Sequence, residues 1–318
     1  MSELCPTAQA LSRTISYPLK HRLYSKLRPP KLADWRYGVT VCIAAIGRNG
    51  YSHAPDYGDE VIVLISDQKL TLFYTSSDGV VTKRFHFHKE WVAMMAGNDI
   101  TPCVEIMDAS SKLLVKRNNT LRNVTNAVKT AFQNRLQQLV EDKILSRYGM
   151  KLADFRRNGK KQFTPEVFNS LCSQIDNTAL DCEFLVSGFD AGREPHIFTV
   201  TNPGIVNVYD RPGFWAIGSG ANTALSMLFY RGQNIETEME QTLYHAFEAK
   251  FMAESASDVG RETQFFIAKH GCNTVTWSSP NLINEIRNEW EQHGKPPFPP
   301  DVLKKIRVAE ITLTKEDS

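Results

Sequence analysis

Four residues in the first third of the chain have the types and the order needed to hydrolyse an amide. They are Thr40, Asp67, Lys83 and Gly97. A threonine hydroxyl is a weak nucleophile, and a free α-amine on the same residue can take its proton. A nearby lysine lowers the pKa of that amine, a carboxylate orients the lysine, and a glycine N–H can receive the oxyanion. The set therefore predicts a hydrolytic site, provided that the amine of Thr40 becomes free.

Each of these residues also has an ordinary structural interpretation. Thr40 is a good strand former, Asp67 would cap a turn, and Lys83 would be a solvated position on a half-buried strand. Taken singly, those interpretations are favoured. The joint order and spacing with Gly97 favour a present or ancestral active site.

Strands must position the first two residues. Residues 39–47 and 60–67 are apolar runs rich in β-branched and small side chains, which predict strands buried on both faces. Residues 49–60 hold glycine, proline and polar residues and predict a connecting loop. Further strands are expected at 70–76, 80–89 and 91–97. Short turns between them indicate a mostly antiparallel sheet.

The remainder of the chain alternates helical and strand blocks. Residues 100–147 have apolar side chains at helical spacing and predict two amphipathic helices, and the basic stretch 148–165 predicts a connecting insertion. Strands are expected at 181–190, 195–201 and 204–210, a strand–turn–helix at 214–232, a helix at 237–257 and a hairpin at 262–279. This order predicts an α+β fold of two stacked antiparallel sheets, with helices on both outer faces.

The layout resembles the proteasome β-subunit and the peptidase subunit of the bacterial ATP-dependent two-component protease. Lys83 lies sixteen residues after Asp67, and Gly97 lies fourteen residues after Lys83, which are the intervals of that family. The segment WAIGSGANTAL is similar to the family's strand-to-helix segment and places Ser219 in a supporting role. The segment SASDVGRETQFFIA is similar to the one with a supporting aspartate, here Asp258.

The resemblance covers residues 39–277 and implies a four-layer αββα sandwich of the N-terminal-nucleophile (Ntn) hydrolase type. It implies a threonine-type peptidase in which Thr40 attacks, Asp67 and Lys83 assist, and Gly97 stabilises the oxyanion. Peptide or protein substrates, a homo-oligomeric ring and an ATP-dependent unfolding partner are implied as well, without a cofactor or a metal. A non-catalytic shell or scaffold subunit of the same fold and a small-molecule Ntn amidohydrolase remain alternatives.

Two positions depart from the family pattern. Arg261 stands where the family usually has a serine, and Val39 separates Gly38 from Thr40, whereas self-cleaving precursors usually have glycine directly before the nucleophile. Three arrangements would account for the second departure. The chain cleaves itself after Val39, it is an uncleaved inactive relative, or translation starts at position 39 on a GTG codon and the initiator methionine is removed.

Composition sets the remaining expectations. The chain has 318 residues and a formal net charge of +2, which gives no indication of nucleic-acid or membrane binding. Six cysteines without a C-x-x-C pair fit a reducing cytoplasm, and we expect a soluble, cytoplasmic protein. Residues 1–38, with seven Lys/Arg and two Asp/Glu, predict a flexible leader rather than a transit peptide. The Ntn domain is then expected at 39–279 and a C-terminal extension at 280–318.

Other polar motifs favour structural roles. The turn at 218–220 precedes a predicted helix and could bind an anion, but no lysine follows as in a phosphate loop, so a packing turn is favoured. His86 and His88 would share one face of a strand and could bind a metal, but no third ligand is near in sequence. Cys42 is expected in the core.

Overall fold

The computed structural model describes residues 40–49, 59–72, 75–79, 82–98, 101–271 and 280–294, all within the unit Tyr37–Ser318. The predicted leader, the second half of the predicted hairpin and the end of the chain lie outside the described residues. Within the described ranges, no helix has both the length and the apolar character needed to cross a membrane.

The first antiparallel sheet positions Thr40 and Asp67 at the same end of adjacent strands. In spatial order it consists of β10 (Phe214–Ile217), β1 (Cys42–Arg48), β2 (Glu60–Asp67) and β11 (Thr263–Lys269). Cys42 pairs with Ser66, and the N–H of Asp67 donates to the carbonyl of Val41 at 3.2 Å. The start of β1 therefore lies beside the end of β2.

The second antiparallel sheet carries the residues that follow Lys83. Its order is β5 (Arg84–His88), β6 (Trp91–Gly97), β7 (Cys182–Phe189), β8 (Pro195–Thr201) and β9 (Ile205–Val208). A separate two-stranded ribbon consists of β3 (Leu70–Leu72) and β4 (Thr75–Ser77). The expectation of two antiparallel sheets in a mixed α/β protein is confirmed.

A buried apolar cluster receives side chains from both sheets. The first sheet contributes Cys42, Ala44, Ile46, Ile62 and Leu64, and the second contributes Val92, Met94, Leu185 and Ile197, among others. Because side chains alternate along a strand, the intervening residues of β1 point to the opposite face. Burial of β1 on both faces explains its nearly continuous apolar sequence.

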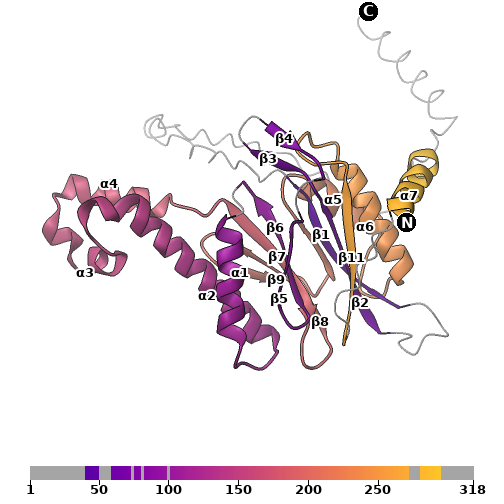
Figure 1. Cartoon of the computed structure of the whole chain (residues 1–318), viewed down its shortest axis with the longest axis horizontal. Coiled ribbons are helices and arrows are strands. Elements are labelled where there is room, and N and C mark those ends of the chain that lie inside the picture. Colours follow the sequence, from indigo (N-terminus) through magenta and orange to yellow (C-terminus); the bar gives the residue numbers. More distant parts are fainter. Residues whose placement is uncertain are drawn as a thin grey trace, which may run out of the picture. The chain divides into compact units, whose positions relative to one another are not determined.

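Helices cover the other face of each sheet (Figure 1). The helices α1 (Thr101–Leu114) and α2 (Leu121–Val140) share a buried cluster with the second sheet. The helices α5 (Ala221–Tyr230) and α6 (Met239–Ala253) share another with the first sheet. The pair expected at 100–147 is confirmed, and α2 begins at the cap Thr120, whose side chain accepts from Asn123 N.

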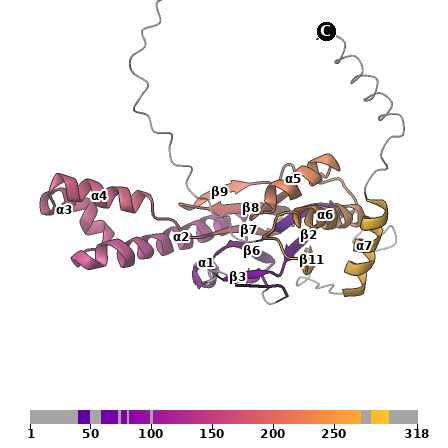
Figure 2. The ribbon, with the colours of Figure 1, turned by 90° about the horizontal axis from the view of Figure 1, so that it is seen from above.

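The stretch 148–165, interpreted from the sequence as a connecting insertion, is largely helical. After α2 the chain continues through η1 (Glu141–Leu145), η2 (Ser146–Tyr148), α3 (Leu152–Gln162) and α4 (Pro165–Asp176). Figure 2 shows α3 and α4 at the far end of α2. These elements form a small apolar cluster of their own, which includes Phe155 and Leu171. Because α3 contains several basic residues and few apolar ones, its helical spacing was not visible in the sequence.

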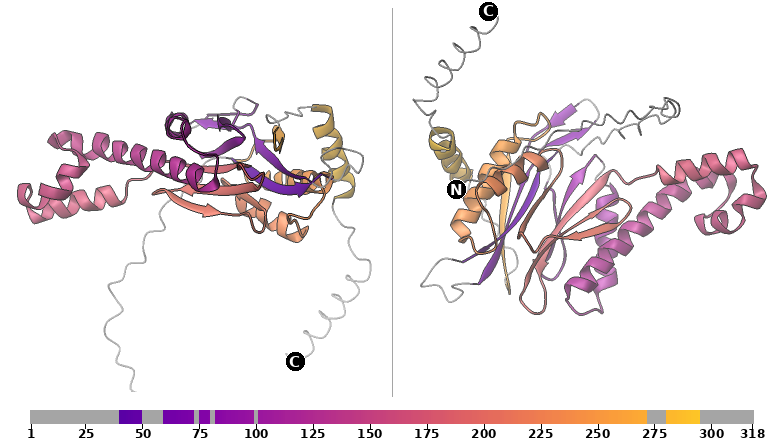
Figure 3. Two further views of the ribbon diagram at one scale, coloured as in Figure 1. Left: turned by 90° about the horizontal axis from the view of Figure 1, so that it is seen from below. Right: turned by 180° about the vertical axis from the view of Figure 1, so that it is seen from behind.

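The helix α7 (Pro280–His293) belongs to the expected C-terminal extension, for which the sequence predicted no element. Its residue Trp290 packs on Phe251 of α6 with ring centroids 5.3 Å apart. Arg287 makes two hydrogen bonds, of 2.6 and 2.8 Å, to the carboxylate of Glu254. Figure 3 shows the yellow helix α7 beside the orange α6. This part of the extension therefore packs on the same core as α6.

Candidate active site

Thr40, Asp67 and Lys83 meet in a buried group. The Thr40 hydroxyl donates to Asp67 Oδ1 and accepts from Lys83 Nζ. Lys83 Nζ also lies 2.7 Å from Asp67 Oδ1, and only 5% of the lysine side chain is exposed. The hydroxyl is thus held between an ammonium group and a carboxylate, in a setting where electrostatic interactions are stronger than in water.

Backbone N–H groups hold the Asp67 carboxylate from several sides. Its Oδ1 accepts from Val41 N at 3.0 Å, and its Oδ2 accepts from Lys69 N at 3.2 Å and from Gly260 N at 3.1 Å. With the Lys83 ammonium, these donors satisfy a carboxylate that has no exposed surface. The orientation of Asp67 is therefore fixed by the fold.

The turn before α5 holds the backbone of Thr40. Ser219 Oγ accepts from Thr40 N and donates to Thr40 O, both at 3.3 Å, and Gly220 N donates to Thr40 O at 3.2 Å. Gly218 has φ +94°, and a side chain there would collide with the Thr40 carbonyl oxygen. Glycine is needed at that position because of both its backbone conformation and the close approach. The turn at 218–220 thus packs on Thr40, as the favoured interpretation required.

Gly97 ends β6, the strand that lies next to Lys83. The N–H of Met95 donates to Lys83 O at 3.0 Å, and the Met95 carbonyl accepts from Cys42 Sγ at 3.3 Å. Two residues further on, Gly97 has φ +154° and lies so close to the Asp181 carbonyl that a Cβ could not fit. Gly97 is therefore placed on the strand that borders the Thr40 group.

Asp258 is not brought into this group. Its side chain is exposed, and its hydrogen-bond partner is Ser257 Oγ at 3.4 Å. The nearby Gly260 contacts Asp67 instead, through its backbone. Arg261, the departure from the family pattern, is exposed, and its guanidinium lies 3.7 Å from Glu291 on α7.

A buried lysine that the sequence analysis missed supports the 260–261 segment. Lys250 Nζ donates to the carbonyl oxygens of Gly260 at 2.9 Å and Arg261 at 2.7 Å, and to Glu254 Oε1 at 2.5 Å. Burial lowers the pKa of Lys250 to about 8. The sequence did contain a signal for Lys250. It lies within the mostly apolar helical segment AFEAKFMA, where a residue is expected to face the core.

Cys42 is the thiol closest in sequence to the site. Burial is the main cause that raises its pKa to about 12. Since the thiolate is the nucleophilic form, Cys42 is an inert core residue at neutral pH. This agrees with its expected place in the core.

A small cavity of about 270 Å³ opens beside Ser219. Glu183, from β7, is the one carboxylate among its described lining residues, and its Oε1 accepts from Gly218 N at 2.9 Å. Burial is the main cause that raises the pKa of Glu183. The sequence analysis missed Glu183, although an acid inside the apolar strand CEFLVSGF was a visible signal.

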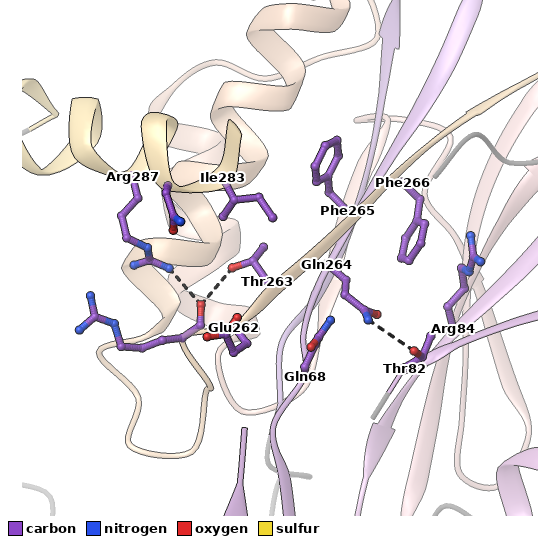
Figure 4. A pocket seen from close by; sticks show the side chains of 12 residues that line it. Gln68, Thr82, Arg84, Glu262, Thr263, Gln264, Phe265, Phe266, Ile283 and Arg287 are labelled. Carbon is purple, nitrogen blue, oxygen red and sulfur yellow. Dashed lines mark hydrogen bonds between the residues drawn. The ribbon is translucent and has the colours of Figure 1, made fainter. Parts of the chain in front are cut away.

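A larger cavity of about 710 Å³ lies along β11, between α7 and the start of β5 (Figure 4). Gln68, which follows Asp67, lines it, and so do Thr82 and Arg84, which flank Lys83. The Arg84 guanidinium lies over the Phe266 ring, 3.8 Å from its centroid. The two cavities thus border the Thr40 group through different residues.

Within the described ranges, no group of three or more His, Cys, Asp or Glu residues is arranged to hold a metal ion. A bulge in the pairing with β6 interrupts the register between His86 and His88.

Comparison with known proteins does not assign the chain to a family. No model of a protein family matches the chain, and no curated protein is similar to it. The site therefore has to be interpreted from its own geometry.

Proposed function

We propose that the chain is a threonine-type Ntn hydrolase that cleaves peptide bonds, with the four-layer αββα fold of proteasome β-subunits. The observation that carries the proposal is the contact of the Thr40 hydroxyl with both Asp67 and Lys83. The packing of a helix pair on the outer face of each of two facing sheets supports the fold.

The reaction requires that the peptide bond before Thr40 has been broken. The α-amine then takes the Oγ proton, and Oγ attacks the carbonyl carbon of the substrate. The carbonyl oxygen becomes an oxyanion that the N–H of Gly97 stabilises, a contribution of about 100- to 1,000-fold. The substrate C–N bond breaks as the amine passes its proton to the leaving nitrogen. Water then hydrolyses the ester and restores the Thr40 hydroxyl.

The roles of the neighbouring residues follow from their contacts. The Lys83 ammonium, held by Asp67, polarises the hydroxyl and disfavours a second positive charge on the amine. Ser219 contacts the Thr40 nitrogen and would orient the amine. Asp258 receives no role because it makes no contact with this group in the described part of the chain.

The inactive scaffold is the second candidate. In the full chain the Thr40 nitrogen is bonded to Val39 and cannot act as a base, and Thr40 is buried. A chain that keeps this bond would have the fold without the activity. Ring assembly and an ATP-dependent partner stay predictions that depend on the resemblance.

The N-terminal residue of the natively expressed protein, determined by intact mass and Edman sequencing, tests the proposal together with peptide hydrolysis. We expect Thr40 at the N-terminus and cleavage of fluorogenic peptides, with acyl-amino-acid amides as the small-molecule comparison. Thr40→Ala should lose about 1,000-fold or more in rate, and Thr40→Ser should retain part of it. Full activity in Thr40→Ala would refute the mechanism, and a retained residue 39 would favour the scaffold.

A further inference from the structure

The carboxylate of Glu183 has no cationic partner among the described residues. Its Oε1 accepts from Gly218 N, and no lysine, arginine or histidine of the described part lies within ion-pair distance. The described residues that line the 270 Å³ cavity also include no cationic side chain. A partly buried carboxylate without a counter-charge is costly, so a cationic ligand would be favoured there.

Glu183 is linked to the candidate nucleophile through one turn. Gly218 contacts Glu183, and the next residue, Ser219, contacts the Thr40 nitrogen. Glu183 also lies opposite Ala96 in the pairing of β7 with β6, one position before Gly97. The carboxylate is therefore close in the fold to both the amine and the proposed oxyanion donor.

The proposed chemistry determines which half of the substrate faces this cavity. The amine of Thr40 must pass its proton to the leaving nitrogen, so the leaving nitrogen has to lie on the amine side of the nucleophile. Ser219 Oγ accepts from the Thr40 nitrogen, and Ser219 also lines the cavity. The first residue of the leaving half is thus directed towards the cavity.

We propose that this cavity binds the first side chain of the leaving half and that Glu183 selects a lysine or arginine there, an inference that rests on the proposed threonine mechanism. The volume is slightly below that of pockets for drug-sized ligands, about 300–1,000 Å³, and suits one side chain. Tyr209 and Trp215, stacked with centroids 3.8 Å apart, line the same cavity and offer aromatic surface for the stem of a basic side chain.

Hydrolysis of a peptide series tests the selection. The peptides differ only in the residue after the cleaved bond, which is lysine, norleucine or glutamate. We expect kcat/KM to be about tenfold higher for lysine than for norleucine, and lowest for glutamate. In Glu183→Gln the ratio of kcat/KM for the lysine peptide to that for the norleucine peptide should fall to about one. The glutamine amide oxygen can still accept from Gly218 N. The matched control Glu262→Gln removes an acid that lines the other cavity and should keep the preference.

Binding to a variant that cannot turn over separates this inference from the proposed function. Lysinamide and norleucinamide are titrated into Thr40→Ala and into Thr40→Ala/Glu183→Gln, and binding is followed by calorimetry. We expect about tenfold tighter binding of lysinamide, lost in the second protein. Equal affinities, or a preference that survives Glu183→Gln, would overturn the selection even if the wild type cleaves peptides. Selective binding without any hydrolysis by the wild type would support the cationic site and refute the threonine mechanism.

Discussion

Lys83 Nζ lies 2.7 Å from Asp67 Oδ1, and this pair joins the two sheets of the protein. Asp67 ends β2 in the first sheet, and Lys83 directly precedes β5 in the second. Both side chains contact the Thr40 hydroxyl, so the position of this hydroxyl depends on how the sheets face each other. A charged pair in this place ties the chemistry of the site to the packing of the core.

Neutralising Asp67 should impair both stability and activity. Asp67→Asn keeps the shape of the side chain but removes the negative charge that lies 2.7 Å from the buried Lys83 ammonium. We expect a loss of about 3–5 kcal/mol in the free energy of unfolding, measured by urea denaturation. Asp154→Asn, at an exposed ion pair with Arg157, should change it by less than about 0.5 kcal/mol.

A double variant checks the cause of that loss. Asp67→Asn combined with Lys83→Met removes both charges of the pair, so we expect it to lose less stability than the sum of the two single variants. Additive losses would show that the two side chains contribute independently. Peptide hydrolysis should remain low in all three proteins because each lacks part of the arrangement around Thr40.

A side chain at Gly97 should be poorly tolerated. Gly97→Ala places a Cβ against the Asp181 carbonyl at a backbone conformation that alanine rarely adopts. Gly149→Ala is the matched control, because Gly149 also has a positive φ but has no atom within 4 Å of the added Cβ. We expect Gly97→Ala to cost at least about 1 kcal/mol more than Gly149→Ala in thermal or urea unfolding, and to reduce hydrolysis further. Equal costs would contradict the close approach.

Cys42 should be unreactive in the folded protein. Its pKa is raised to about 12, chiefly by burial, so almost no thiolate exists at pH 8. Iodoacetamide should label the partly exposed Cys172 before the buried Cys42, which should react only after denaturation, as peptide mapping by mass spectrometry would show. Rapid alkylation of native Cys42 accompanied by inactivation would point to a cysteine rather than a threonine nucleophile.

Lys250 predicts a stability that rises with pH. Burial lowers its pKa from 10.5 to about 8, so the unfolded chain binds the proton more tightly than the folded chain does. The cost of burying the charge is fully present below pH 8 and is relieved as pH rises to about 10.5. Relative to Lys250→Met, the free energy of unfolding should increase by up to about 3 kcal/mol over this window. If the difference in the free energy of unfolding between the wild type and Lys250→Met did not change with pH, the prediction would be contradicted.

The sequence predicted the parts of the fold that follow from local periodicity. The apolar runs at 39–47 and 60–67 and the helical spacing in 100–147 led to elements that the structure contains. The helix α3 within 148–165 was not predicted, because basic residues and a glycine separate its few apolar positions. These positions pack on neighbouring helices rather than on the main core.

The candidate site was predictable only where spacing along the chain carried the information. Thr40, Asp67 and Lys83 were found in this way, and the structure brings them together. Gly260 could not be found, because it acts through a backbone N–H whose partner lies 193 residues away in sequence. Glu183 stood out as an acid inside an apolar strand, but its contact with Gly218 joins segments that are distant along the chain.

Among the described residues, the contacts that hold Thr40 involve its own nitrogen or atoms on the C-terminal side of the bond that precedes it. Its carbonyl is bound by the turn before α5, and its hydroxyl by Asp67 and Lys83. Removal of everything upstream would leave each of these interactions in place. On the proposed mechanism, maturation would then demand no rearrangement of Thr40 relative to these partners, and the precursor would already hold its hydroxyl between Asp67 and Lys83.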